Sequence, residues 1–455
     1  MRDSSDMQDE AQYKGLWFLP EEPERRIPGT LVTNSATGAF LDLNGSFRTI
    51  SYGKQIDSLL TYELVLGTVK GTEISLYNCV ETSSNFSLPR SFATEHAHTA
   101  TLAVETVFIG THFQNKASLQ LSDFMVSYTG LTEWTKKTGF TVGEKSPKEF
   151  VITYKTLPPI QVAQIDDYTV NIVTEANGNT PIVGRREANL KETLYAQFEF
   201  STPRHYDDGL KVVNLFANFL TLAIGKPIYK LRILAEGKRI EIFLSNKEVG
   251  GASWLFASEM LFSLDDSEDK LSTLFKNYIE KQEQLEPIYN LYFGTLYNPR
   301  MYLSHTFLSL AQAAETYHRQ IRKGGVLTKP EYKAKKSKII QSVSPEHKDW
   351  LEKKLEFGNE LTLQERMEEL LRDCSDTVRQ FIGDVGEFAT RVKATRNYLT
   401  HFSTKSKNVA DGDDLIHLTY KLKILIEECI LRELGFSRED IDFVIGNSIH
   451  TPQLI

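Results

Sequence analysis

The sequence predicts an α+β protein of more than one domain, in which a β-rich region is followed by an all-α helical bundle. Apolar residues alternate with polar ones through most of residues 1–260, as in half-buried strands. Across residues 261–455 the apolar residues recur about every 3.6 positions, as in amphipathic helices. At 455 residues the chain is also too long for one ordinary domain. We therefore expect a boundary near residue 260, and a further division of the first region near residues 90–100 stays open.

Strands are expected in the first region wherever the alternation lies between turn residues. Residues 74–80 and 194–200 alternate in this way. Residues 228–234 and 239–244 flank the turn-forming sequence Ala-Glu-Gly-Lys, which predicts a β-hairpin. One helix interrupts the strands at about residues 207–224, because its apolar side chains share one face and a glycine follows it.

The second region predicts a series of helices, each introduced by capping residues or ended by glycine. Asp265 to Ser267 supply capping residues before a helix through Tyr278, and Ser437 with Asp440 resembles a capping box on a last short helix. Between them, one helix is expected with Leu303 to Ile321 on its apolar face and an end at Gly324-Gly325. Others are expected at about residues 346–356, 362–382, 384–402 and 413–434.

Composition narrows the class of protein and its location. The cysteines Cys79, Cys374 and Cys429 are too far apart for a metal site or a disulfide framework, which favours a reducing cytoplasm. The N-terminus is polar, and the sequence lacks an apolar run long enough to cross a membrane. The net charge is −8, so a nucleic-acid partner would need a local basic patch. Candidate lysines for such a patch are Lys333, Lys335, Lys336, Lys405 and Lys407.

The sequence lacks the common motifs for nucleotides, covalent hydrolysis and catalytic zinc, namely GxxxxGK[ST], GxGxxG, GxSxG and HExxH. Pairs of carboxylates, such as Asp166 with Asp167, fall in turns or at helix starts, where capping explains them. We therefore expect neither a cofactor nor a metal ion.

One pattern stands at the end of a late helix, just before a polar loop: Arg396-Asn-Tyr-Leu-Thr-His401. It resembles the RxxxxH motif of HEPN ribonucleases, many of which also have Asn directly after the Arg. Arg300-Met-Tyr-Leu-Ser-His305 has the same spacing but opens a helix near the start of the bundle, whereas the family places its motif at a late helix end. Arg396 and His401 are therefore the preferred pair.

Two further segments resemble the ApeA-like branch of that family. One is the helix Phe307-Leu-Ser-Leu-Ala-Gln-Ala-Ala-Glu-Thr-Tyr-His-Arg319. The other is the opening Gly15-Leu-Trp17-Phe-Leu-Pro20, continued by Pro28-Gly29-Thr-Leu31. The resemblance implies a metal-independent endoribonuclease toxin that acts in abortive defence against phage. It also implies a homodimer through the helical domain, and an N-terminal region of about 260 residues that senses a phage-derived trigger or restrains the nuclease.

The chemistry of RNA cleavage gives the motif residues their expected roles. Histidine titrates near neutral pH and serves as acid or base, so His401 is the expected proton-transfer group. Arg396 stays charged and grips phosphate oxygens in a fork. Asn397 shares a helix face with His401, and Glu315 on the earlier helix is a candidate to orient His401 or Arg396.

The spacing of the pair constrains the site. Arg396 and His401 are five residues apart, which places them about 140° apart around an ideal helix. They converge only if the helix frays or if two chains pool their residues, and the latter agrees with the dimer that the resemblance implies. Alternatives remain: a cation pair that only caps the helix, or a non-catalytic HEPN module that binds RNA or a partner. A toxin silenced by a nucleotidyltransferase is disfavoured, because Ser403 stands where such partners modify a tyrosine.

Overall fold

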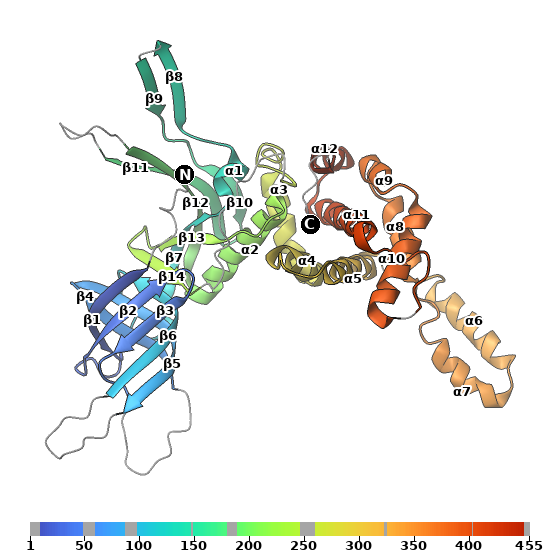
Figure 1. Ribbon diagram of the computed structural model, residues 1–455, viewed down its shortest axis with the longest axis horizontal. Helices are drawn as coiled ribbons and strands as arrows, with labels where there is room; N and C mark the ends of the chain where they lie inside the picture. Colours follow the sequence, from blue (N-terminus) through green and yellow to red (C-terminus); the bar gives the residue numbers. More distant parts are fainter. Residues whose placement is uncertain are drawn as a thin grey trace. The chain divides into compact units, whose positions relative to one another are not determined.

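The computed structural model describes residues 10–48, 60–86, 98–146, 149–179, 189–245, 260–322, 325–402 and 404–449. The chain divides into two compact units: unit 1 is Met1–Leu220 with Ile228–Leu255, and unit 2 is Thr221–Pro227 with Phe256–Ile455. Strands dominate the first unit and helices the second, which confirms the predicted fold class (Figure 1). The domain boundary near residue 260 stays a prediction, and the optional division near residues 90–100 falls largely outside the described residues.

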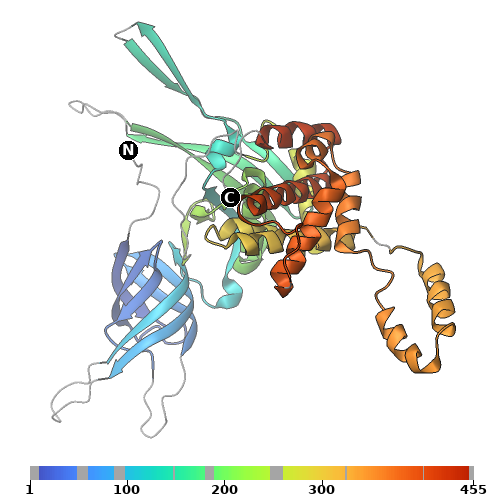
Figure 2. The same cartoon turned by 45° about the vertical axis from the view of Figure 1, so that its right-hand side comes forward.

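The first half of unit 1 is a ring of antiparallel strands. The strands are β1 (Ala11–Phe18), β2 (Ile27–Asn34), β3 (Gly38–Leu43), β4 (Thr61–Val69), β5 (Thr72–Phe86) and β6 (His98–Ile109). They pair in the order β6-β3-β2-β1-β4-β5, and β5 pairs back with β6, so the ring closes on itself (Figure 2). Alternate side chains point inward and form an apolar core that includes Leu31, Leu76 and Val104.

The opening segment that carries the N-terminal resemblance forms part of this core. Trp17 is fully buried, and its ring lies over two glycines, Gly29 on β2 and Gly67 on β4. A Cβ at Gly67 would stand 2.2 Å from the indole, and one at Gly15 would stand 2.4 Å from the Thr68 carbonyl oxygen. These positions require glycine because the backbones and the indole pack too closely for a side chain.

The second half of unit 1 extends the sheet beyond β6. Its strands are β7 (Gln120–Tyr128), β10 (Ile160–Ile165), β11 (Tyr168–Asn179), β12 (Asn189–His205), β13 (Lys230–Ala235) and β14 (Ile240–Leu244), in the order β10-β11-β12-β7-β13-β14. The predicted hairpin is the antiparallel pair β13–β14. The predicted helix is α2 (Tyr206–Ile224), whose Phe216 packs against Tyr128 and Phe198 of the sheet. The short helix α1 (Leu131–Thr135) and the separate pair β8 (Phe140–Ser146) and β9 (Glu149–Tyr154) complete the unit.

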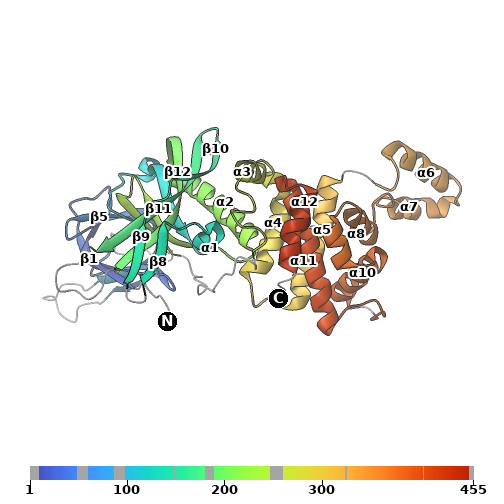
Figure 3. The same ribbon diagram turned by 90° about the horizontal axis from the view of Figure 1, so that it is seen from above.

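Unit 2 is a bundle of helices, seen from above in Figure 3. The helices are α3 (Leu271–Glu280), α4 (Gln282–Tyr297), α5 (Leu303–Ile321), α6 (Lys329–Gln341), α7 (Pro345–Lys354), α8 (Leu363–Arg372), α9 (Asp376–Ile382), α10 (Val385–His401), α11 (Gly412–Leu434) and α12 (Arg438–Ile449). Helix α11 is the most buried of these and packs against α3, α5, α9 and α12, while α10 packs against α5, α8 and α9. Among the described helices, none combines the length and the apolar character that crossing a membrane requires.

Several helix boundaries differ from the expected ones. The predicted helix over residues 362–382 is two helices, α8 and α9, because the Ser375 side chain caps α9 at Val378 while its backbone N–H donates to buried Glu428. Helix α3 begins at Leu271, without a side-chain cap, because Asp266 instead accepts hydrogen bonds from Ser263. Helices α4 and α6 were not expected. The reciprocal bonds between Ser437 and Asp440 are present, as predicted.

Candidate active site at the end of helix α10

Helix α10 carries the RxxxxH motif on its last two turns. Asp384 caps the start of the helix by accepting a hydrogen bond from the Glu387 N–H, and the helix buries Phe388, Val392 and Thr395. The Thr395 hydroxyl accepts a hydrogen bond of 2.9 Å from the Ala410 N–H, which ties the start of the motif to the chain just before α11. The motif is thus anchored one residue before its arginine.

The helix stops immediately after His401. Phe402 takes the left-handed conformation with φ of 47°, and its N–H closes the helix on the Tyr398 carbonyl oxygen at 2.7 Å. Such a conformation is uncommon for a residue other than glycine, and here it ends the helix. The side chains of His401 and Phe402 are both exposed, with Phe402 at 77%. His401 is therefore open to a ligand at the helix end.

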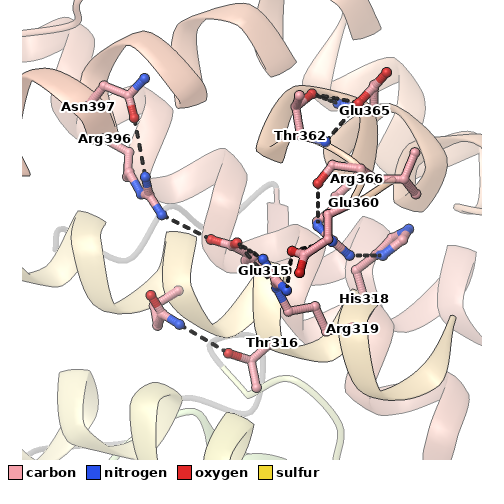
Figure 4. A network of polar contacts seen from close by, with 12 residues as sticks. Glu315, Thr316, His318, Arg319, Glu360, Thr362, Glu365, Arg366, Arg396 and Asn397 are labelled. Atoms are coloured by element: carbon pink, nitrogen blue, oxygen red, sulfur yellow. Dashed lines mark hydrogen bonds and ion pairs between the residues drawn. The ribbon is translucent and has the colours of Figure 1, made fainter. Parts of the chain in front are cut away.

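The Arg396 guanidinium is held on two sides (Figure 4). One nitrogen donates to the Asn397 side-chain oxygen at 3.2 Å, and another contacts the Glu315 carboxylate on α5 at 3.2 Å. Arg396 is 33% exposed, whereas Glu315 is only 12% exposed, so the pair lies at the edge of the bundle. Of the two partners considered for Glu315, the structure places Arg396 beside it. Asn397 contacts the arginine of the motif.

Glu315 belongs to a longer network of charged groups. Its carboxylate also accepts a hydrogen bond from Arg319, one turn along α5, at 3.0 Å. Arg319 in turn contacts Glu360 at 2.8 Å, in the segment that leads into α8 (Figure 4). The Glu315 carboxylate thus serves two guanidinium groups and ties the position of Arg396 to that of Arg319.

The network continues to a buried histidine that sequence reasoning did not single out. His318 and Arg366 are both buried, and Arg366 donates to the His318 Nδ1 at 3.1 Å. Since guanidinium can only donate, Nδ1 accepts, and the Nε2–H donates to Glu369 at 2.9 Å. Burial lowers the pKa of His318, and the charge of Arg366 lowers it further, against the opposing effect of Glu369. The available signal was its place on the apolar stripe of α5, next to Tyr317.

The two motif residues do not meet within the chain. Helix α10 is continuous through His401, so the two side chains project about 140° apart, with a rise of about 7.5 Å between them. Within the described residues, no hydrogen bond joins Arg396 to His401. In the second RxxxxH pattern, exposed Arg300 lies in the turn before α5, and exposed His305 lies in the first turn of α5. That pattern spans a turn and a helix start.

The candidate lysines lie on two separate segments. Lys333 and Lys335 are exposed on α6, while Lys336 lies 3.7 Å from Glu352 of α7. After the motif, Lys405 is paired with Asp411, and Lys407 is exposed. Ser403 lies outside the described residues. The three cysteines are buried and free, and the described part of the chain holds no cluster of metal-ligating side chains.

A β-rich unit followed by a helical bundle, with RxxxxH at a late helix end, is the arrangement of a HEPN-type protein. Residues 12–278, more than half of the chain, match the model of ApeA N-terminal domain 1, and residues 308–440 match that of the Apea-like HEPN domain. The chain belongs to the ApeA-like HEPN family, as its sequence had indicated. This membership indicates a HEPN-type defence protein; HEPN domains are generally ribonucleases and commonly dimerise. No curated protein and no solved structure matches the chain.

Proposed function

We propose that this protein is a metal-independent endoribonuclease that cleaves RNA with Arg396 and His401 as part of abortive defence against phage. The observation that carries the proposal is the geometry at the end of α10. There, Glu315 and Asn397 hold Arg396 in place, and His401, the last residue of the same helix, is exposed. Family membership supports the reaction class.

The proposed reaction needs only protein groups. The RNA 2′-hydroxyl loses its proton to a base and attacks the adjacent phosphorus, and the bond to the 5′-oxygen breaks as that oxygen takes a proton from an acid. Arg396 stabilises the negative charge that gathers on the phosphate oxygens. His401 acts as the base or the acid, and the products are a 2′,3′-cyclic phosphate and a 5′-hydroxyl.

The geometry of α10 favours a site shared between two chains. Because the helix does not fray before His401, one chain does not bring its arginine and histidine to one phosphate. Two copies that pair through α10 would place the histidine of one chain near the arginine of the other. We propose this homodimer, with unit 1 as the element that responds to a phage-derived trigger in the cytoplasm and Lys333, Lys335, Lys336, Lys405 and Lys407 as RNA contacts.

Substitutions in the motif test the proposal. His401→Ala and Arg396→Ala should each reduce RNA cleavage and cellular toxicity by about a hundredfold or more. Both should change the free energy of unfolding by less than about 1 kcal/mol, because His401 is exposed and Glu315 keeps its contact with Arg319. Glu315→Gln should give a smaller loss of cleavage, of about tenfold, since Asn397 still holds the arginine.

The second RxxxxH pattern provides the matched control. Arg300→Ala and His305→Ala remove the same two residue types from exposed positions before and within α5, and they should leave cleavage unchanged. Cleavage should also survive EDTA and leave 2′,3′-cyclic or 3′-phosphate ends. Full activity of the His401 variant, or activity that requires added Mg²⁺ or Mn²⁺, would show that the mechanism is wrong.

A non-catalytic HEPN module that binds RNA or a partner is the second candidate. The observation that favours it is that Arg396 already has two partners within its own chain, while His401 projects to another side of the helix. The same variants separate the two functions. A binding module would hold RNA without cutting it, and His401→Ala would then change neither binding nor toxicity.

A further inference from the structure

Helices α6 and α7 form a hairpin that stands apart from the other helices of unit 2 (Figures 1 and 3). Neither helix contains a buried residue. The two ends of the hairpin meet at Asn359, whose side chain donates to the Leu327 carbonyl oxygen and accepts from the Leu327 N–H, each at 2.9 Å. The Val326 N–H also donates to the Asn359 carbonyl oxygen at 3.0 Å. The hairpin is therefore fastened at its base and open to solvent along its length.

The two faces of α7 differ in character. Lys348 and Leu351 are half-buried on the side that faces α6. Trp350 lies on the opposite side and is 61% exposed. Lys353 and Lys354 follow it by three and four residues, so both lie within about 60° of the indole around the helix. We call Trp350, Lys353 and Lys354 the outer face of α7.

The hairpin carries positive charge within an acidic protein. Residues 329–354 contain eight lysines and four carboxylates, whereas the whole chain has a net charge of −8. Three of these carboxylates have partners within the hairpin or its cap. Glu331 accepts bonds from Thr328, Glu346 lies 3.6 Å from His347, and Glu352 lies 3.7 Å from Lys336. Lys353 and Lys354 are exposed, and neither forms an ion pair with another described residue, so both are available to a polyanion.

We propose that the outer face of α7 binds single-stranded RNA, with a base stacked on Trp350 and the flanking phosphates on Lys353 and Lys354. This inference deepens the proposed function, on which it rests, by naming the form of RNA that is recruited. An exposed indole beside two lysines suits an unpaired base, which offers a flat surface next to a phosphate. A duplex keeps its bases stacked inside, and an apolar protein partner would need several apolar side chains, whereas the outer face as defined here has one, Trp350, beside two lysines.

Direct binding to a labelled uridine oligonucleotide of about ten nucleotides tests the proposal. The full-length chain with His401→Ala serves as the background, so that the RNA stays intact. Trp350→Ala should weaken binding by between about fivefold and a hundredfold, and Trp350→Phe should retain most of it. Phe443→Ala is the matched control, because Phe443 is an aromatic residue of α12 that is 60% exposed and lies outside the hairpin.

The lysines are tested by the salt dependence of the same binding. Replacing Lys353 and Lys354 together by Ala should reduce the slope of log K against log salt by about 1.4, since each phosphate contact on a single strand contributes about 0.7. Lys276→Ala, at an exposed position on α3, should leave the slope unchanged. A duplex RNA of equal length should compete at least about tenfold less well than the single strand.

The outcomes separate this inference from the proposed function. Unchanged affinity in Trp350→Ala, an unchanged salt slope in the double lysine variant, or equal competition by duplex RNA would each overturn it. If the parent chain never cleaves RNA and Trp350→Ala still loses RNA binding, the result would support this inference and refute the proposed nuclease activity. Melting temperatures equal to that of the parent chain establish that the variants are folded, which the absence of buried residues in the hairpin leads us to expect.

Discussion

His318 and Arg366 are buried side by side in unit 2, at the far end of the network that holds Arg396. A neutral histidine makes this arrangement possible, because a protonated one would present a second cation and a donor to the arginine. The sequence predicted Arg396 and His401 from their spacing and context. Glu315 was a candidate from the sequence, but its contact with Arg396 depends on how α5 and α10 pack. The place of His318 likewise depends on the packing of α5 and α8, which spacing along one helix does not contain.

We predict that His318 makes the protein less stable in mild acid. Burial lowers its pKa in the folded state, so the unfolded chain takes up the proton first as the pH falls below about 6.5. The stabilisation is therefore complete above that pH and is lost as the pH falls through the lowered folded pKa, with Arg366, Glu369 and Arg322 as the surrounding charges. Urea unfolding of His318→Gln should show a smaller loss of stability between pH 7.5 and 5.5 than the parent chain. Equal losses would contradict the assignment.

At the scale of elements, the sequence pattern predicted helix α10 but did not predict helix α6. Helix α10 has an apolar stripe and a capping aspartate, and both signals are local. Helix α6 has few apolar residues and reads as a charged segment, although Thr328 and Glu331 form a capping box at its start. The break between α8 and α9 depends on buried Glu428 of α11, a contact between residues far apart in the sequence.

The C-terminal cap of α10 yields a stability prediction. Phe402 has φ of 47°, and its side chain is largely exposed, so Phe402→Gly removes backbone strain and loses little burial. We expect a gain of about 1 kcal/mol, or about 2–4 °C in melting temperature. Gly435→Ala, at the left-handed C-cap of α11, should shift the melting temperature in the opposite direction. An unchanged or lower melting temperature of Phe402→Gly would show that the ring stabilises the helix end.

At the scale of the whole molecule, the change of sequence period predicted a β-rich region followed by a helical one, and the structure has both. The order in which the strands pair was harder to predict from the sequence. The ring closes through β5 and β6, and β6 also joins β14, which lies more than 130 residues later in the chain. Turn residues and alternation identify strands, but they carry little information about which distant strands become neighbours.

Mixed dimers test the proposed assembly. One inactive chain carries Arg396→Ala and the other carries His401→Ala, and the two are co-expressed. If each cleft takes its arginine and its histidine from opposite chains, a mixed dimer contains one complete cleft, and activity should return to about half per dimer. Mixing should restore nothing if each chain acts alone. A strictly monomeric protein in light scattering at micromolar concentration, with full activity, would refute the shared cleft.

The Asn359 fastening also has a consequence for how the family can diverge. The hydrogen bonds between Leu327 and Asn359 hold together the two ends of the intervening segment. For the folding of the bundle, this segment is therefore a closed loop. The entropy of closing a loop grows slowly with length, by about 0.6 kcal/mol for each doubling. Relatives can therefore lengthen, shorten or exchange this segment at little cost to the folding of the other helices of unit 2. If the outer face of α7 binds RNA as proposed, selection for a new RNA target would act on this segment and leave the other helices of the bundle unchanged.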